Sequence, residues 1–320
     1  MSPNIKGALY ALIAFGIFAT HDVLVKILGG LYSPVQLVFF SVLLSFPLAT
    51  LMLMRDATPG TLLPAHPWWM ALRTVAAVVT GMSAFYAFSV LPLAQVYAMI
   101  FASPLIITVL AIPILGEKVR LRRGLAVLVG LVGVMVVLRP GQTELGLGHL
   151  AALMAAFGGA LNSVVVRKIG ADERNVVLLL YPMVANFLVM GAFLALVYKP
   201  MPVEHLGLLA ILSVLAWVAG LGIIAAYKSG EAVIVAPMQY SQILWASAYG
   251  AFFFDEQIDG ATALGSAIII ASGLYIVLRE SKSGNSANRP VLRTRSRPET
   301  GTTLRISPFL PSSIRFKRGQ

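Results

Sequence analysis

The chain has 320 residues, of which 58% are hydrophobic and only 12% are charged, and its mean hydropathy is +0.85. This composition excludes an ordinary soluble domain and predicts an all-α integral membrane protein. The absence of cysteine excludes a disulfide framework and thiol chemistry. The net charge of +11 does not indicate a nucleic-acid partner, because nine Lys or Arg against one acid are concentrated in residues 281–320.

Ten apolar stretches follow one another between residues 7 and 279, each near the roughly 20 residues that a helix needs to cross a bilayer. Glycines, prolines and charged clusters such as "RDATPG" and "FDEQIDG" separate them. A count of nine is the alternative, because the third and fourth stretches meet closely at Leu91-Pro92. The predicted transmembrane helices cover residues 7–28, 34–54, 68–90, 93–115, 120–138, 147–168, 176–198, 206–227, 232–254 and 260–279.

Lys and Arg are distributed unevenly between alternate loops. If the N-terminus is cytoplasmic, the opposite side of the membrane keeps only Lys26, Arg139 and Lys199. Positive charge is enriched in cytoplasmic loops, so both termini are predicted to be cytoplasmic. A cleavable signal peptide over residues 1–20 is the alternative, but no small-residue cleavage site precedes His21.

Residues 281–320 form a basic tail that is rich in Ser, Pro, Gly and Arg and lacks helical periodicity. This composition predicts a disordered cytoplasmic extension that is attracted to anionic lipid headgroups. A regulatory or partner-binding arm is the alternative.

Two segments of the chain repeat each other. "FASPLIITVLAIPILGE" at 101–117 aligns with "YSQILWASAYGAFFFDE" at 240–256. The chain therefore divides into two five-helix halves, 7–139 and 147–279, and the odd number of helices inverts the second half in the membrane. Inverted repeats are typical of secondary transporters, which open one site alternately to either side of the membrane.

These motifs resemble the drug/metabolite transporter superfamily, specifically proteins with two EamA domains. The second half departs from the pattern, because Ile243 stands where Pro104 would align. The resemblance implies ten helices in two inverted EamA repeats and transport of a small metabolite. It is carried in the first half by Arg73, the Pro-Leu-Ala connection at 92–94, Ser103-Pro104 and "LGEKV" at 115–119.

Three stretches look most like the bacterial riboflavin importer branch of that superfamily: "ATHDVLVK", "LRTVAAVVTGMSAFYAFSVLPLAQVYA" and "AVIVAPMQYSQILWA". This resemblance implies uptake of riboflavin, a planar heterocycle, by alternating access. The same stretches also look like S-adenosylmethionine importers. Transport of S-adenosylmethionine or of an amino acid, in either direction, is therefore the alternative.

Hydrogen-bonding side chains are costly inside apolar spans, so their distribution outlines an aqueous path. Spans 120–138 and 260–279 almost lack them and are expected to form scaffold or a homodimer contact. The other spans carry the polar residues, Asn186 and Trp217 among them. We expect the substrate pathway to involve His21, Asp22, Arg73, Tyr86, Gln95, Tyr97, Asn162, Tyr181, Gln239, Tyr240, Gln242 and Trp245.

Pro104 and Pro237 interrupt predicted helices in corresponding halves, because each removes a backbone hydrogen bond. Such paired interruptions indicate a site near the membrane midplane, and we expect both prolines to act as hinges. Gln239 and Gln242 match an amide or uracil-like edge, and Tyr240 offers stacking surface, which suits an isoalloxazine ring. Simple packing is the alternative interpretation of the aromatic residues.

The stretch "THDVLVK" places three polar groups inside the first span. Asp22 and Lys26 are four residues apart on one helical face, which predicts an ion pair near the outer mouth. Alternatively, His21 and Asp22 face the cavity as a proton-sensitive coupling group or as hydrogen-bonding partners of the substrate.

Three further charged residues have two interpretations each. Arg73 lies near the predicted cytoplasmic edge, so its guanidinium either serves the pathway or extends to lipid phosphate. Glu117 and Glu256 each precede a helix, where stabilisation by the helix dipole is expected and a gate ion pair is the alternative.

No enzyme activity, cofactor or metal is predicted. His66, His149 and His205 lie in predicted loops, and the sequence has no HExxH, GxSxG or phosphate-binding loop. An integral membrane enzyme or a sensor is the alternative class, but the tail has no recognisable effector domain.

Overall fold

The computed structural model describes residues 3–54, 61–116, 121–139, 145–170, 172–229 and 235–281. All regular secondary structure within these ranges is helical, and no strand occurs among them. Seven helices in the described part of the chain are long and apolar enough to cross a membrane. The prediction of an all-α, multi-pass membrane protein is therefore confirmed, whereas the count of ten spans stays a prediction.

The helices follow the predicted ranges in both halves. The first half contains α1 (Pro3–Gly29), α2 (Pro34–Met54), α3 (Pro67–Val90), α4 (Leu93–Ile100), α5 (Ser103–Leu115) and α6 (Leu121–Leu138). The second half contains α7 (Leu147–Ile169), α8 (Asn175–Val197), α9 (Val203–Ser229), the 3-10 helix η1 (Ala236–Ser241), α11 (Gln242–Phe254) and α12 (Gly260–Ser281). Glu117 and nearly all of the predicted tail lie outside the described residues.

The predicted span 93–115 is divided at the expected place. Helix α4 ends at Ile100, and α5 begins at Ser103 with Pro104 in its first turn. Because Pro104 has no N–H, it cannot bond the carbonyl of Ile100 four residues earlier. The Ser103 hydroxyl donates to that carbonyl instead, at 2.6 Å.

A second irregular segment lies in the predicted span 232–254. Pro237 stands in the first turn of the 3-10 helix η1, which leads directly into α11. Turns of 3-10 helix are common at the ends of α-helices, and a 3-10 stretch within a longer helical span often marks a functional hinge. Both predicted interruptions are present in the structure, and their action as hinges stays a prediction.

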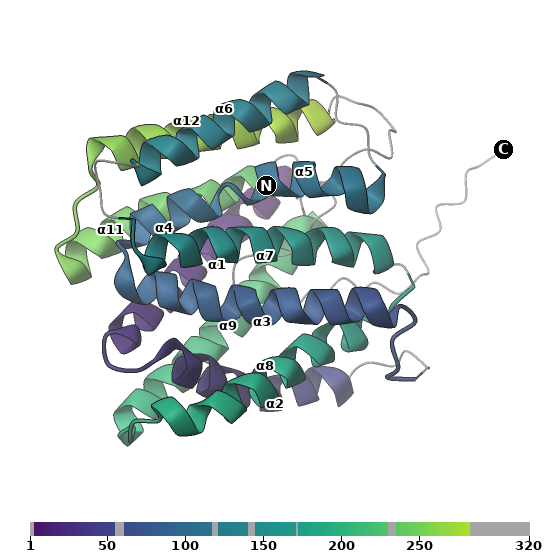
Figure 1. The fold of residues 1–320 in the computed structure, drawn as a ribbon, viewed down its shortest axis with the longest axis vertical. Helices are drawn as coiled ribbons and strands as arrows, with labels where there is room; N and C mark the ends of the chain where they lie inside the picture. Colours follow the sequence, from purple (N-terminus) through teal and green to yellow (C-terminus); the bar gives the residue numbers. More distant parts are fainter. Residues whose placement is uncertain are drawn as a thin grey trace.

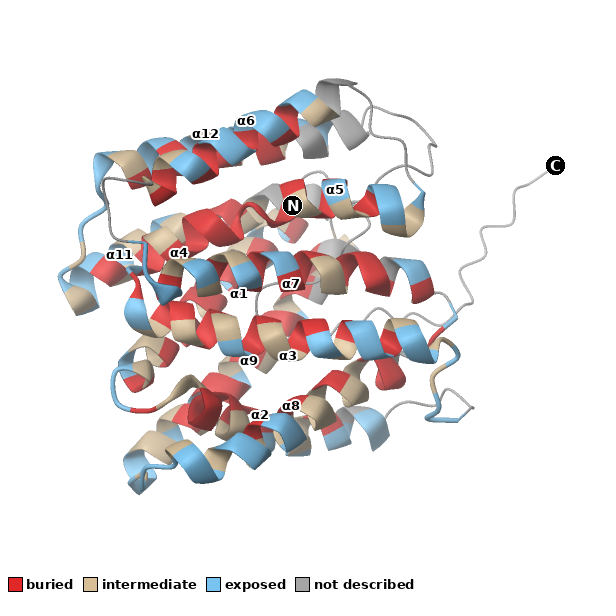
Figure 2. Ribbon diagram, viewed as in Figure 1, coloured by how far each residue is buried: buried red, intermediate tan, exposed pale blue. Residues whose placement is uncertain are grey.

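The bundle is arranged in pairs of helices (Figure 1). Helices α6 and α12 lie side by side along one edge, and α2 and α8 lie together along the opposite edge. Between these edges α1 packs extensively on α9, and α3 packs on α7. Figure 2 shows that buried residues face the interior of this arrangement, while exposed residues follow its outer faces.

Helices α6 and α12 approach closely because glycines face each other across their contact. A Cβ atom at Gly133 would lie 2.9 Å from the Gly265 carbonyl, and one at Gly265 would lie 2.7 Å from the Gly133 carbonyl. Small residues permit such contacts between membrane helices. The outer face of the pair exposes Leu128 and Val132, which suits contact with lipid. A homodimer at this face stays a prediction.

Candidate functional site

A buried chain of hydrogen bonds connects α1, α4 and α11. His21 Nδ1 and Asp22 Oδ1 are 2.7 Å apart, and the Tyr97 hydroxyl donates to the other oxygen of Asp22. The Gln242 amide donates to the Tyr97 hydroxyl at 3.3 Å. All four side chains are buried, so the structure brings four of the predicted pathway residues together away from solvent.

The two irregular segments meet beside this chain. Phe101, at the break between α4 and α5, packs edge-on against Tyr240 of η1 with ring centroids 5.1 Å apart. The Tyr97 ring lies between Phe88 and Phe101, with centroid distances of 5.4 and 6.0 Å. The hydroxyl of Tyr97 is thereby held towards Asp22, because aromatic contacts fix the ring from two sides.

His21 has one nitrogen that is not used by the surrounding protein. Its Nε2 is buried and has no hydrogen-bond partner among the described residues, while the ring lies edge-on to Phe85 at 6.2 Å. The side chain is fully buried. An imidazole nitrogen in this state can hydrogen-bond a polar ligand atom.

The predicted ion pair between Asp22 and Lys26 is wrong, because the last turn of α1 directs Lys26 elsewhere. Lys26 Nζ lies 2.6 Å from Glu256 Oε1 and also donates to the Leu91 carbonyl at 2.6 Å. Glu256 in turn accepts the N–H of Leu93 at 3.0 Å. The first interpretation of Glu256, dipole stabilisation of the next helix, is therefore replaced by an ion pair between the two halves.

Arg73 does not extend to the lipid surface, as one interpretation had it. Its side chain is buried, and its guanidinium donates to the Leu178 carbonyl of α8. That carbonyl lacks a helical partner because the residue four positions later, Pro182, has no N–H. Arg73 thus connects α3 to α8 at a position where α8 leaves an acceptor unused.

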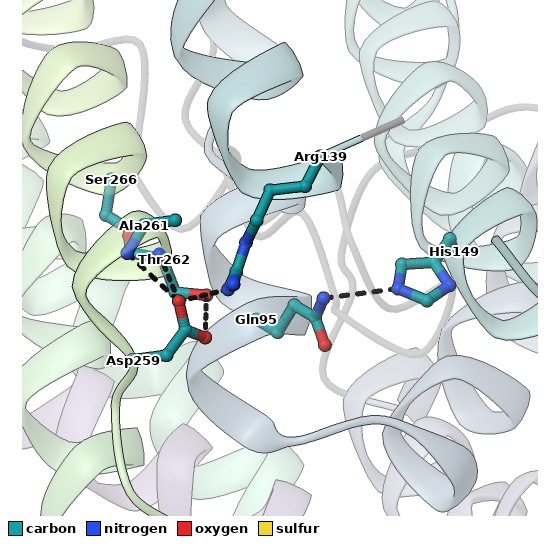
Figure 3. A network of polar contacts seen from close by, with 7 residues as sticks. All are labelled: Gln95, Arg139, His149, Asp259, Ala261, Thr262 and Ser266. Atoms are coloured by element: carbon teal, nitrogen blue, oxygen red, sulfur yellow. Dashed lines mark hydrogen bonds and ion pairs between the residues drawn. The ribbon is translucent and has the colours of Figure 1, made fainter. Parts of the chain in front are cut away.

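Two more contacts, both drawn in Figure 3, join residues of the two halves. Gln95 Nε2 lies 3.1 Å from His149 Nε2, which connects α4 to α7. Arg139 at the end of α6 pairs with Asp259 just before α12. Together with the pair of Lys26 and Glu256, these contacts form what we call the clasp. His149, predicted to lie in a loop, stands in the first turn of α7, and no local pattern in the sequence relates it to Gln95.

Asp259 also caps α12. Its carboxylate accepts hydrogen bonds from the N–H groups of Ala261 and Thr262 and from the Thr262 hydroxyl, at 3.0, 2.9 and 2.7 Å. Partial burial would raise the pKa of this carboxyl, but the hydrogen bonds from Thr262 and the nearby Arg139 guanidinium together lower it.

The other predicted pathway residues are not members of the buried chain. Tyr181 packs in a separate cluster with Met70 and Ile169, and Trp245 is 40% exposed and packs on Gly16. The remaining three are half-buried: Tyr86 on α3, Asn162 on α7 and Gln239 in η1.

A cavity lies between α2, α8 and α9, near the middle of each helix. It encloses about 510 Å³ of space, part of it open to the surroundings. Asn186 and Trp217, which belong to the polar set noted in the sequence but not to its main candidates, contribute to the wall. The lining residues are Val42, Ser45, Leu48, Ala49, Leu179, Met183, Asn186, Ser213, Ala216 and Trp217.

The model of the EamA-like transporter family matches residues 5–139 and 146–279, which include almost all of the apolar part of the chain. The chain belongs to the EamA-like transporter family. Its two matches to the family confirm the predicted resemblance to proteins with two EamA domains. As a transporter of this type, it is generally not expected to be an enzyme.

Curated relatives of this EamA-like transporter carry two different substrate names. It is 25% identical to an S-adenosylmethionine uptake transporter of Rickettsia prowazekii, over 88% of this chain and 96% of the relative. It is 28% identical to a riboflavin transporter of Vibrio cholerae, over 67% of this chain and 72% of the relative. An uncharacterized transporter of Helicobacter pylori is 24% identical, over 84% of this chain and 93% of the relative.

The fold of this EamA-like transporter is also found in a solved crystal structure of another protein. The two chains superpose with a TM-score of 0.54 at 17% sequence identity, over 83% of this chain and 96% of the other. At this identity the likeness concerns the fold alone.

Proposed function

We propose that this transporter moves a small metabolite across the bacterial inner membrane by alternating access, with uptake of riboflavin as its leading activity. The observation that carries the proposal is the buried chain of His21, Asp22, Tyr97 and Gln242. This chain lies where the two irregular helical segments meet. Polar groups at interrupted helices in both halves are the usual location of a transporter's substrate or coupling site.

Helix packing supports the inverted repeat and the ten spans. A two-fold relation between α1–α6 and α7–α12 would exchange α1 with α7, α2 with α8 and α3 with α9. The contact of α1 with α9 would then correspond to the contact of α7 with α3. The same relation would also match α2 on α9 to α3 on α8, and would pair α2 with α8 and α6 with α12. All of these contacts are present.

The clasp supports a working cycle with an outer gate. Both termini are proposed to be cytoplasmic, which places the clasp at the outer surface. Its contacts join residues of the first half to residues of the second, such as Lys26 to Glu256. We propose that the clasp is closed in this conformation and opens when the site faces outwards.

Riboflavin suits the residues beside the buried chain. Gln242 offers amide groups for a uracil-like edge, and Tyr240 with Phe101 offers aromatic surface for a planar ring. S-adenosylmethionine is the second candidate, because relatives with that name match almost their whole length. Asp22 would then be the group that meets the positive charge of the substrate.

The proposal is tested by uptake of labelled riboflavin and of labelled S-adenosylmethionine into liposomes that contain the purified chain. We expect saturable riboflavin uptake that unlabelled riboflavin abolishes. Gln242→Ala should lower this uptake strongly, because it removes the donor to Tyr97. Riboflavin uptake no greater than in empty liposomes, with intact inserted protein, would refute the riboflavin assignment.

Asp22→Asn distinguishes the two candidate substrates. For a neutral substrate the amide still accepts the Tyr97 hydroxyl, so we expect riboflavin uptake to fall only several-fold. For a cationic substrate the loss of the carboxylate should abolish uptake. Comparing the two labelled substrates in one preparation of the Asp22→Asn variant therefore decides between them, with Asp255→Asn, which changes an exposed carboxylate at the end of α11, as the control.

A further inference from the structure

Two residues that line the cavity between α2, α8 and α9 each carry a buried hydrogen-bonding atom that the described part of the protein does not use. Asn186 Oδ1 and Trp217 Nε1 are buried, belong to residues that line this cavity, and have no hydrogen-bond partner among the described residues. Buried polar atoms in native proteins are nearly always paired, so an unpaired one calls for an explanation. Two of them on residues that line one cavity point to a site for a polar ligand.

Each of the two atoms can take only one role in a hydrogen bond. The side-chain amide nitrogen of Asn186 donates to the Pro182 carbonyl at 2.8 Å, which leaves the amide oxygen as a free acceptor. Asn186 is only 3% exposed, so water does not readily satisfy that oxygen. The indole nitrogen of Trp217 can only donate. The two lining side chains therefore carry one unused acceptor and one unused donor.

The other polar groups of the wall are already engaged. Ser45 donates to the Ser41 carbonyl at 2.7 Å, and Ser213 donates to the carbonyls of Ser41 and Leu209, both at 3.0 Å. No charged side chain is among the described residues that line the cavity. A neutral group fits such a wall better than an ion, because an unpaired charge would be costly there.

We infer that Asn186 and Trp217 bind the hydrogen-bonding edge of a neutral heterocycle. A ring N–H or amino group donates to Asn186 Oδ1, and a neighbouring carbonyl or ring nitrogen accepts from Trp217 Nε1. This inference rests on the proposed transport function and gives the substrate's edge a second position on the path, distinct from the one proposed at Gln242. Both the imide edge of an isoalloxazine and the amino edge of an adenine have it.

The position of the cavity agrees with this role. Asn186 lies at the middle of α8, and Trp217 lies near the middle of α9. A ligand edge bound there sits at mid-depth in the bundle, where a transporter must hold its substrate between the two openings. The apolar part of the wall, including Val42, Leu179 and Met183, can then cover the faces of the ring.

The test measures binding of riboflavin, adenosine and S-adenosylmethionine to the purified full chain in detergent by calorimetry. Asn186→Leu and Trp217→Phe each remove one of the two groups while keeping most of the side-chain volume. We expect each to weaken binding of the heterocycle roughly 5- to 100-fold. Trp68→Phe makes the same exchange at a side chain that is 87% exposed, and it should bind as the wild type does.

Riboflavin methylated on its imide nitrogen tests the Asn186 contact without any substitution in the protein. The methyl group removes the ligand's donor, so this probe should bind the wild type more weakly than riboflavin does. In Asn186→Leu the two ligands should bind alike, as a coupled pair requires. If S-adenosylmethionine and adenosine bind but riboflavin does not, the same comparison is made with N6,N6-dimethyladenosine.

Equal affinity in wild type, Asn186→Leu and Trp217→Phe would overturn the inference, and so would a wild-type chain that binds none of the three compounds. Uptake into liposomes distinguishes a failure of this inference from a failure of the proposed function. If binding depends on Asn186 and Trp217 but riboflavin is not taken up, the riboflavin assignment is refuted and the proposed site stands. If riboflavin is taken up and neither substitution changes its uptake, the riboflavin assignment stands and the proposed site at Asn186 and Trp217 is refuted.

Discussion

At the scale of single residues, proline determines where two polar side chains form hydrogen bonds. Proline has no N–H group, so the carbonyl four residues earlier is left to accept a hydrogen bond from a side chain. Pro104 leaves the Ile100 carbonyl to the Ser103 hydroxyl, and Pro182 leaves the Leu178 carbonyl to Arg73. In both cases a helix in an apolar environment must satisfy a backbone acceptor from elsewhere. The prolines can be read in the sequence, and so can the carbonyls they leave free. The identity of the distant donor, Arg73, cannot.

This relation between Arg73 and Pro182 predicts a coupled effect on stability. Arg73→Met should lower the melting temperature of the detergent-solubilised chain, because it leaves a buried carbonyl without a donor, at a cost of about 1–3 kcal/mol. Pro182→Ala restores a backbone N–H to that carbonyl. Arg73→Met should therefore cost about 1 kcal/mol less in the Pro182→Ala background than in the wild type.

Thermal unfolding of the wild type, Arg73→Met, Pro182→Ala and the double variant in the same detergent gives this comparison. Two substitutions whose effects simply add would show that Arg73 stabilises the protein through other contacts. Arg73→Lys is a useful further variant, since an ammonium keeps the charge but has a different reach and geometry.

At the scale of helical elements, the end of one helix is fixed by its neighbour in the other half. Asp259 caps the first turn of α12 and at the same time pairs with Arg139 at the end of α6. The cap could be predicted from the sequence, because Asp is a preferred residue just before a helix. The partner of the same carboxylate could not, since α6 and α12 are far apart in the chain.

The lowered pKa of Asp259 predicts a pH dependence of stability. The folded-state pKa lies below the unfolded value of 3.8, so the carboxylate stabilises the fold at neutral pH. This contribution is lost as the pH falls through the folded-state pKa. The melting temperature of Asp259→Asn should therefore lie below that of the wild type at pH 7, and the difference should shrink below about pH 4. The effect is expected to be small, because the side chain is 48% exposed.

Melting temperatures of both proteins between pH 7 and pH 3.5 check this expectation. Arg139→Gln should reproduce part of the loss at pH 7, because it removes the cation but leaves the cap to Thr262. A difference between Asp259→Asn and the wild type that is constant across the range would contradict an ionised cap.

At the scale of the whole molecule, the clasp joins helices that lie far apart in the chain at one end of the bundle. Lys26, Gln95 and Arg139 of the first half each contact a residue of the second half at the same end. Contacts between halves must separate at one end at a time if a site is to open alternately. The clasp therefore connects the local chemistry of Lys26 and Glu256 to the proposed transport cycle.

Cross-linking across the clasp should stop transport. The chain has no native cysteine, so Lys26→Cys with Glu256→Cys provides the only two thiols. A short bis-thiosulfonate that bridges them should abolish uptake into liposomes, and reduction of the bridge should restore it. Each single-cysteine variant treated with the same reagent is the control. Undiminished uptake by a fully cross-linked chain would mean that the clasp does not open during transport.

The sequence by itself determined the helical and membrane-spanning nature of the chain and the residues at which two of its helices break. These properties depend on local composition, hydropathy and proline, each of which acts within a few residues. Only the tertiary structure decided that Asp22 meets Tyr97, that Lys26 pairs with Glu256 instead of Asp22, and that Asn186 and Trp217 share a cavity. The choice of partner depends on how helices distant in the chain pack against each other, and that packing leaves no local pattern in the sequence.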